Sequence, residues 1–340
     1  MNPVRVLVVD DSATMRALLK RSLSTTPDIE VIGEAGDPYD ARQKMKMLDP
    51  DVVTLDVEMP NMSGLEFLEK IMRLRPTPVI MVSNQTGPGA AATVAALEIG
   101  AFDCIPKPSG LAGNTFDGLP ALIREAAKAK PIMVARRRPP TGAPAAPVEV
   151  ASRHTDWPEL IGIGSSTGGV EALITVLADF PEDCPPTMIV QHLPASFTGS
   201  FSQRLDRLCR ARVKEAVDGD PISQGHIYLA PGGWHLTLKK AGGLRCALSK
   251  EDPVQGHRPS VDVLFSSIAR NFQGRATGVI LTGMGRDGAA GLLEMRKKGA
   301  HTFGQNEATS LVYGMPRVAF EIGAVERQVP LGKVARSIFE

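Results

Sequence analysis

The sequence has few cysteines, almost no net charge and no long apolar run. The four cysteines show no Cys-x-x-Cys spacing, so neither a disulfide framework nor a zinc site is expected, and a reducing cytoplasm is the expected location. The net charge of +1 gives no support to nucleic-acid binding by bulk electrostatics. Because no run of 18 apolar residues occurs, we expect no membrane insertion. The amino terminus also lacks a signal-peptide cleavage pattern.

Length and charge divide the chain into parts. A chain of 340 residues with 43% hydrophobic residues predicts about two folded domains and excludes wholesale disorder. Residues 1–124 carry 12 Lys/Arg against 16 Asp/Glu (−4), residues 125–153 carry 6 against 2 (+4), and residues 154–340 carry 20 against 19 (+1). The middle part is also rich in proline, which favours a linker. We therefore predict domains at 1–124 and 153–340, with a helix end and proline-rich linker at 125–152.

A run of three arginines, Arg136–Arg138, lies in that middle part. It could contact nucleic acid, but no aromatic residue is interleaved with it, which favours a solvated linker.

Both flanking parts alternate short apolar runs with helical patterns. The runs are continuous and rich in β-branched residues, which is typical of parallel strands that are buried on both faces. We therefore predict an α/β fold with two doubly wound parallel sheets, and ligands at the carboxyl ends of the strands. The predicted strands are 4–11, 28–35, 50–60, 76–83 and 102–108 in the first domain, and 160–166, 187–194, 225–232, 277–285 and 301–306 in the second.

Polar side chains follow four strands of the first predicted sheet. Asp10 and Asp11 end the first strand, Asp56 the third, Ser83 the fourth and Lys107 the fifth. Three carboxylates at one edge repel each other and call for a cation, and oxygen ligands suit Mg²⁺. A hydroxyl and a lysine beside a carboxylate would suit a transferred phosphoryl group.

These residues lie in the motifs VVDDS, LDVEMPNMSGLEFL, MVS and IPKP. Through them the first domain resembles the flavodoxin-like receiver domain of response regulators. The resemblance implies phosphorylation of Asp56 by a histidine kinase. It also implies an Mg²⁺ site of Asp10, Asp11, Asp56 and the Glu58 backbone carbonyl, a switch involving Ser83 and Phe102, and a phosphoryl partner in Lys107.

The first strand of the second domain runs into Ser165-Ser166-Thr167-Gly168-Gly169 and then a helix. A dinucleotide fingerprint would need glycine where Thr167 stands, and a P-loop would need a lysine after Gly169. The third interpretation is a nucleophilic serine at a sharp bend beside a helix N-terminus, although a serine there could also be a helix cap.

A nucleophilic serine needs a base and an orienting acid. His192 ends the next strand, and Asp287 follows the strand after 277. Ser166, His192 and Asp287 are therefore expected to meet at one sheet edge, and triads are recognised by their roles rather than by chain order. His257 remains an alternative base.

These residues fall in GIGSSTGGVEAL, IVQHLPASFTGSFSQRLD, IYLAPGGWHL, HRPSVDVLFSS and ILTGMGRDGAAGL. Through these motifs the second domain resembles the catalytic domain of chemotaxis protein-glutamate methylesterases. The resemblance implies Ser166 as the nucleophile, with His192 and Asp287 completing the triad. It further implies the Met284 N–H as an oxyanion donor and Thr167 beside the site; the family usually has alanine where Ser165 stands.

The resemblance implies a phosphorylation-activated serine hydrolase that demethylates glutamyl methyl esters and deamidates glutamines on the cytoplasmic helices of chemoreceptors. Hydrolysis itself would need no cofactor. One alternative is a related receiver-regulated esterase that acts on a non-chemotactic receptor system. Another is a response regulator whose output is binding rather than catalysis, which the balanced charge and strand-rich pattern of 154–340 disfavour.

Overall fold

The computed structural model describes residues 2–84, 87–108, 116, 118–136 and 157–340. The chain forms two compact units, Met1–Ala143 and Pro144–Glu340, and each is described by itself. In the described residues no helix is long and apolar enough to cross a membrane.

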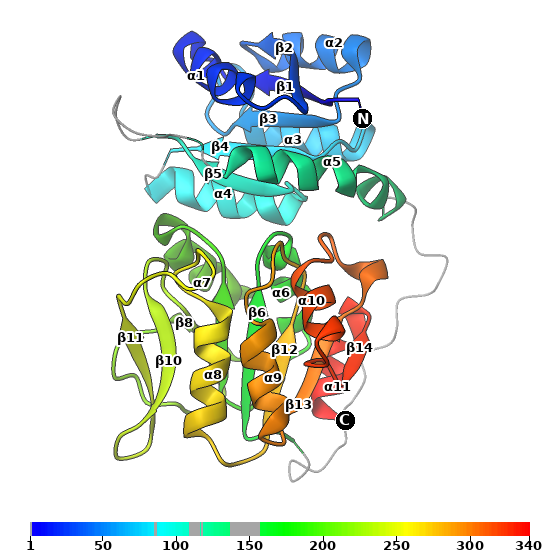
Figure 1. Ribbon diagram of the computed structural model, residues 1–340. Helices are drawn as coiled ribbons and strands as arrows, with labels where there is room; N and C mark the ends of the chain where they lie inside the picture. Colours follow the sequence, from blue (N-terminus) through cyan, green and yellow to red (C-terminus); the bar gives the residue numbers. More distant parts are fainter. Residues whose placement is uncertain (1, 85–86, 109–115, 117, 137–156) are drawn as a thin grey trace. The chain divides into compact units, whose positions relative to one another are not determined.

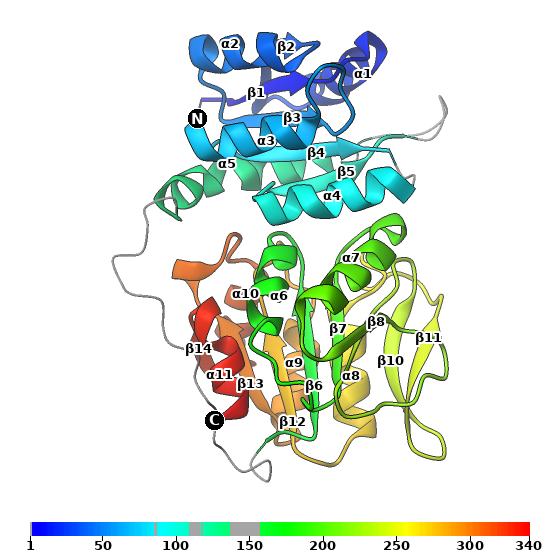
Figure 2. The same cartoon turned by 180° about the vertical axis from the view of Figure 1, so that it is seen from behind.

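The first unit is built on a five-stranded parallel sheet in the order β2-β1-β3-β4-β5. Helices α1 and α5 cover one face of this sheet, and α2, α3 and α4 cover the other (Figures 1 and 2). The strands are β1 (Val4–Val9), β2 (Ile29–Ala35), β3 (Val52–Asp56), β4 (Val79–Ser83) and β5 (Asp103–Pro106). The helices are α1 (Ala13–Ser24), α2 (Pro38–Leu48), α3 (Gly64–Leu74), α4 (Gly87–Ile99) and α5 (Leu119–Arg136).

Side-chain caps set where three of these helices begin. Ser12, Asp37 and Ser63 each accept hydrogen bonds from backbone N–H groups in the first turn of α1, α2 and α3, which satisfies donors that the helix itself leaves open. Helix α5 continues to Arg136, so the helix end predicted at the start of 125–152 reaches past Pro131. The rest of the predicted linker, including Arg137 and Arg138, lies outside the described residues.

The second unit contains a seven-stranded parallel sheet in the order β14-β13-β12-β6-β7-β9-β8. Helices α8, α9 and α10 lie on one face, and α6, α7 and α11 on the other (Figures 1 and 2). The strands are β6 (Leu160–Ser165), β7 (Thr187–Gln191), β8 (Arg212–Glu215), β9 (His226–Leu229), β12 (Ala276–Ile280), β13 (His301–Gln305) and β14 (Arg327–Val329). The helices are α6 (Gly169–Leu177), α7 (Ala195–Leu208), α8 (Val261–Asn271), α9 (Ala289–Lys297), α10 (Met315–Glu321) and α11 (Val334–Phe339).

A separate antiparallel hairpin, β10 (His235–Lys240) and β11 (Leu244–Ser249), packs beside α8. The side chains of Ser267 and Asn271 on α8 bond to the backbone of Leu238. These bonds tie the hairpin to α8.

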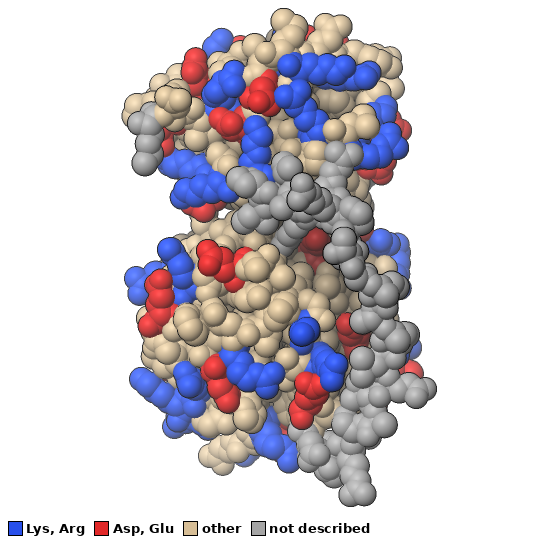
Figure 3. Space-filling view, turned by 90° about the vertical axis from the view of Figure 1, so that its right-hand side faces the viewer, with Lys and Arg blue, Asp and Glu red and all other residues tan. Residues whose placement is uncertain are grey.

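The two parallel sheets confirm the predicted α/β class, but two strands of the second sheet, β8 and β14, do not appear among the predicted strands. Each is short and lies at an edge of the sheet, and each contains only one buried residue. The rule of continuous apolar runs cannot detect such edges. Acidic and basic side chains are interspersed on the face drawn in Figure 3, which fits the near-neutral composition.

Candidate functional site

Ser166 lies in the bend between β6 and α6, at the carboxyl edge of the second sheet. Its N–H donates to the carbonyl of Thr282 at 3.0 Å, and its own carbonyl accepts from the Gly169 N–H at 2.7 Å. Gly168 completes the bend with φ of 76°, a conformation that favours glycine. The backbone of Ser166 is therefore held on both sides while its side chain stands at the sheet edge.

Gln191, the last residue of β7, braces this bend. Its Nε2 donates to the carbonyls of Ser166 at 2.9 Å and His192 at 3.2 Å, and its Oε1 accepts from the Ser165 hydroxyl at 2.6 Å. A Cβ at Gly169 would lie 2.0 Å from Gln191 Oε1, so only glycine leaves room for the brace. Because Ser165 is fully buried and donates to Gln191, its hydroxyl is engaged away from the site, and Ser166 is the better nucleophile.

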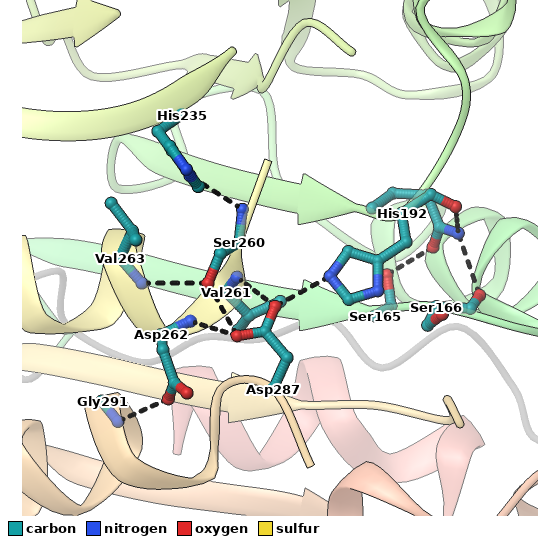
Figure 4. A network of polar contacts seen from close by, with 11 residues as sticks. Ser165, Ser166, His192, His235, Ser260, Val261, Asp262, Val263, Asp287 and Gly291 are labelled. Atoms are coloured by element: carbon teal, nitrogen blue, oxygen red, sulfur yellow. Dashed lines mark hydrogen bonds and ion pairs between the residues drawn. The ribbon is translucent and has the colours of Figure 1, made fainter. Parts of the chain in front are cut away.

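His192 and Asp287 meet as the sequence predicts. Nε2 of His192 lies 2.9 Å from Oδ2 of Asp287. Nδ1 is buried and has no hydrogen-bond partner among the residues that the structure describes. Figure 4 shows this edge of the ring turned toward the bend that carries Ser166. The ring therefore uses its two nitrogens in the reverse of the familiar arrangement, in which Nδ1 faces the acid. No hydrogen bond joins the Ser166 hydroxyl to Nδ1 among the described residues, so the contact between serine and histidine in the triad stays a prediction.

Four groups donate to the Asp287 carboxylate within the described chain. They are His192 Nε2 at 2.9 Å, the Ser260 hydroxyl at 2.7 Å, and the backbone N–H groups of Val261 at 2.7 Å and Asp262 at 3.0 Å. Burial alone would raise the pKa of Asp287, but the bond and charge of His192, with the other donors, hold it below its ordinary value. Asp287 is therefore an ionised acid that can orient the imidazole and stabilise its positive charge.

His257 stacks on the face of His192 and does not lie between His192 and either Asp287 or Ser166. The two rings are 3.8 Å apart between centroids and nearly parallel, at 8°. Burial, with a smaller contribution from His192, lowers the pKa of His257 to about 4. A group with that pKa is a weak base at neutral pH, so the structure favours His192 over His257 as the base.

Two backbone N–H groups near Ser166 differ in their availability. The Gly283 N–H donates to the carbonyl of Val312 at 3.1 Å. The Met284 N–H, one residue on, donates to no acceptor in the part of the chain that the structure describes. Thr167 is buried beside it, and its carbonyl accepts from the Thr282 hydroxyl at 3.0 Å. The Met284 N–H is thus an available hydrogen-bond donor, and the role predicted for it at the oxyanion stays a prediction.

The carboxyl edge of the first sheet gathers the predicted acidic residues. Ligand oxygens of Asp10, Asp11 and Asp56 lie within 4.8 Å of one another. Lys107 Nζ lies 2.7 Å from Asp56 and 3.2 Å from Asp10. One ammonium does not balance three carboxylates, and an all-oxygen donor set is the one that Mg²⁺ prefers, so these residues fit the ion.

The two buried carboxylates of this edge are both poorly compensated. Burial is the main cause that raises the pKa of Asp56 to about 6, and the charge of Asp10 adds to it against the opposing effect of Lys107. Burial likewise raises the pKa of Asp10 despite Lys107. The Asp56 carboxylate is therefore destabilised as an anion until a cation joins it.

The predicted switch residues lie around this edge. Phe102 is fully buried, and Ser83 is buried and accepts a hydrogen bond from the Thr93 hydroxyl of α4 at 2.8 Å. The Glu58 N–H donates to Asp56 at 3.3 Å, and the predicted role of its carbonyl in binding Mg²⁺ stays a prediction. Thr93 was not among the predicted residues, because nothing in a helical segment marks one threonine as the partner of a distant strand end.

A phosphoacceptor edge in one parallel unit and a serine-histidine-aspartate edge in another define a receiver-linked serine hydrolase. Comparisons with known proteins agree with this class. Residues 161–338 match the family model of CheB methylesterase, and residues 6–113 match that of the response regulator receiver domain. The chain therefore belongs to the CheB methylesterase family and carries a receiver domain.

Named relatives extend over the whole chain. The protein-glutamate methylesterase/protein-glutamine glutaminase 1 of Caulobacter vibrioides is 57% identical over 344 residues, which cover 100% of this chain and 98% of that one. The corresponding protein of Agrobacterium fabrum is 56% identical over 337 residues, which cover 99% of this chain and 96% of that one. The solved catalytic domain of Thermotoga maritima CheB methylesterase aligns with a TM-score of 0.52 and 35% identity, over 54% of this chain and 97% of that one.

Proposed function

We propose that this protein hydrolyses γ-glutamyl methyl esters on the cytoplasmic helices of chemoreceptors and deamidates glutamines at such positions. The observation that carries the proposal is the state of His192. Its Nε2 is bound to an ionised Asp287, while its buried Nδ1 has no partner in the described part of the chain and faces the bend of Ser166. An imidazole nitrogen that faces the bend of a serine is suited to accept the serine proton.

The reaction proceeds in two halves. Ser166 Oγ attacks the ester carbonyl carbon, and its proton passes to His192 Nδ1, while Asp287 stabilises the resulting imidazolium. The carbonyl oxygen gains negative charge and accepts from the Met284 N–H, and such a donor contributes about 3 kcal/mol to the lowering of the barrier. The C–O bond to methoxide then breaks, and methanol departs with the proton from His192.

The second half releases the enzyme. Water gives its proton to His192 and adds to the acyl-serine, and the glutamate carboxylate leaves as Ser166 regains its proton. Glutamine follows the same path with ammonia as the leaving group, because the acyl-enzyme is the same. Removal of the methyl group changes the charge of the receptor helix.

Asp56 is the phosphoacceptor in this proposal. Asp10, Asp11, Asp56 and the Glu58 carbonyl would hold Mg²⁺, which would offset the charge of the incoming phosphoryl group. Lys107 would pair with that group, and Ser83 would leave Thr93 to bond to it, which couples the phosphoryl group to α4. A histidine kinase supplies the phosphoryl group in the cytoplasm, and phosphorylation raises the rate of hydrolysis.

Methanol release from methylated receptor membranes tests the proposal. The full chain should release methanol, faster when acetyl phosphate and Mg²⁺ are present, and Ser166→Ala should release none above background. Methanol release by Ser166→Ala at the native rate would contradict the assignment of the nucleophile.

A further inference from the structure

Ser260 stands directly behind the catalytic acid and has no part in the mechanism above. It is fully buried at the start of α8, and its hydroxyl donates to Oδ1 of Asp287 at 2.7 Å. The other carboxylate oxygen, Oδ2, is the one that faces His192. The two oxygens of Asp287 are thus divided between Ser260 on one side and the imidazole on the other (Figure 4).

This division controls the rotation of the carboxylate. The Cβ–Cγ torsion of aspartate has a broad energy profile, so each hydrogen bond that the carboxylate loses makes rotation about this bond easier. The Ser260 bond to Oδ1 opposes that rotation and thereby sets the direction in which Oδ2 points. Backbone N–H groups of Val261 and Asp262 also donate to Asp287, at 2.7 Å to Oδ2 and at 3.0 Å to Oδ1. Ser260 adds a side-chain donor, at 2.7 Å, that can be removed without changing the backbone of the helix.

Ser260 is itself held from the opposite side. Its N–H donates to Nδ1 of His235 at 3.2 Å, and Nε2 of His235 bonds to the carbonyl of Asp252 at 3.1 Å. Because Nδ1 accepts, the proton of this fully buried ring lies on Nε2 and the ring is neutral. A chain of hydrogen bonds therefore runs from His235 of β10 through Ser260 and Asp287 to His192 (Figure 4).

We propose that Ser260 is a positioning residue of the hydrolytic reaction, whose hydroxyl fixes the Asp287 carboxylate so that Nδ1 of His192 stays aimed at Ser166. The proposal rests on the proposed function. Since Ser260 is buried and bonds to Asp287, its effect falls on the stabilisation of the imidazolium and not on receptor binding. It should therefore change kcat and leave KM unchanged.

The hydroxyl must be removed without loss of the helix cap, because Ser260 also accepts from the Val263 N–H of α8. Glycine serves this purpose, since it caps helices almost as well as serine. Ser260→Gly therefore removes the donor to Asp287, and Ser260→Thr keeps it. Ser267→Ala is the matched control, because Ser267 is a buried serine within α8 whose hydroxyl, among the described residues, bonds only to Leu238 and Leu264.

Methanol release by the phosphorylated full chain gives kcat, KM and the pH profile of kcat/KM. For Ser260→Gly we expect kcat to fall about 10- to 100-fold, as for loss of one catalytic hydrogen bond, with KM unchanged. The acidic limb should move to lower pH, because a carboxylate that turns away from the ring stabilises the protonated imidazole less. Ser260→Thr should retain the native position of the acidic limb and most of kcat. Ser267→Ala should retain the native acidic limb and the native kcat.

The position of the acidic limb does not depend on how much of the enzyme is folded, so it separates positioning from stability. A native limb and native kcat in Ser260→Gly would overturn the proposal. So would a loss of kcat that Ser267→Ala shares at equal loss of thermal stability. If the native chain releases no methanol, the proposed function fails; if it does and Ser260→Gly equals it, only this inference fails.

Discussion

Asp56 and Asp287 occupy the same kind of place in two different sheets and have opposite electrostatics. Each follows or ends a parallel strand at the carboxyl edge, and they are 2% and 1% exposed. Yet the pKa of Asp56 is raised to about 6, with burial as the main cause, and that of Asp287 is lowered. Burial is equal, so the difference must come from the partners that each carboxylate finds.

The partners differ in number and sign. Asp287 receives four donors and has a helix start at its back. Asp56 receives Lys107 and the Glu58 N–H and shares its edge with Asp10 and Asp11. The carboxylate that is proposed to bind a cation and accept a phosphoryl group is left with unmet charge, whereas the one proposed to orient an imidazole is fully satisfied.

Removal of the reactive group at each edge should separate the two activities. Ser166→Ala should lower methanol release by about 10⁴- to 10⁶-fold and leave incorporation of phosphoryl groups from acetyl phosphate intact. Asp56→Asn should abolish incorporation and keep the basal rate of hydrolysis. Ser165→Ala is the control for the nucleophile and should stay within about tenfold of native, because it loses only the bond to Gln191. If Ser165→Ala, rather than Ser166→Ala, were the variant that loses methanol release, the nucleophile would be Ser165.

The same substitution at the two aspartates should have opposite effects on stability. Asp287→Asn places an amide among four donors and should lower the free energy of unfolding by about 2–4 kcal/mol. It should also lower hydrolysis by about 10⁴-fold. Asp56→Asn should raise the free energy of unfolding by about 1–2 kcal/mol at pH 8 without Mg²⁺.

The expected gain in the free energy of unfolding for Asp56→Asn follows from the raised pKa of Asp56. The contribution of this carboxyl group to stability is full below pH 3.8 and is lost as the pH rises through about 6. Urea unfolding of both variants at pH 8 checks the pair. If both Asp287→Asn and Asp56→Asn lowered the free energy of unfolding, the proposed electrostatic contrast between the two edges would be wrong.

Magnesium should stabilise one unit and leave the other unchanged. At 100 times its Kd the ion should add about 2.7 kcal/mol to the unit that binds it, and EDTA should reverse this gain. Calorimetry of the full chain should show the shift in one transition, and Asp11→Asn should reduce it. Basal methanol release should be the same with and without EDTA. An equal shift in both transitions, or one that survives in Asp11→Asn, would contradict the assignment of the site.

The smallest effect concerns the ring stacked on His192. The lowered pKa of His257 means that the folded chain resists a proton that the unfolded chain accepts, so stability is lost as the pH falls from 6.5 toward about 4. His257→Gln should therefore gain about 1–2 kcal/mol relative to native between pH 7.5 and pH 5. Denaturant unfolding at both pH values measures this gain. The exposed His301 offers the control variant His301→Gln. If His301→Gln gained as much stability relative to native, the gain in His257→Gln could not be attributed to the burial of His257.

Much of the molecule follows from local patterns. Apolar runs located both sheets, and the polar residues after each run located both edges, because parallel strands place their carboxyl ends together. The residues that support these edges were harder to predict. Ser260 can be recognised as a helix cap before VDVLF, but its bond to Asp287, 27 residues further on, depends on how β12 and α8 meet in space. The same holds for Thr93 and Ser83.

The nitrogen that His192 offers to the serine also lies beyond sequence reasoning. The spacing of Ser166, His192 and Asp287 predicts that they meet, but not which ring nitrogen faces which partner. That choice is set by the angle at which the chain leaves β7, where the His192 N–H donates to the Ser165 carbonyl at 3.1 Å.

The strand order has a consequence for biosynthesis. Strand β6 lies between β7 and β12, and β12 is translated more than a hundred residues after β6. A nascent chain that has been made only as far as β9 contains Ser166 and His192 but not Asp287. The enzyme therefore emerges without hydrolytic power, and a chain cut short before β12 would leave receptors untouched.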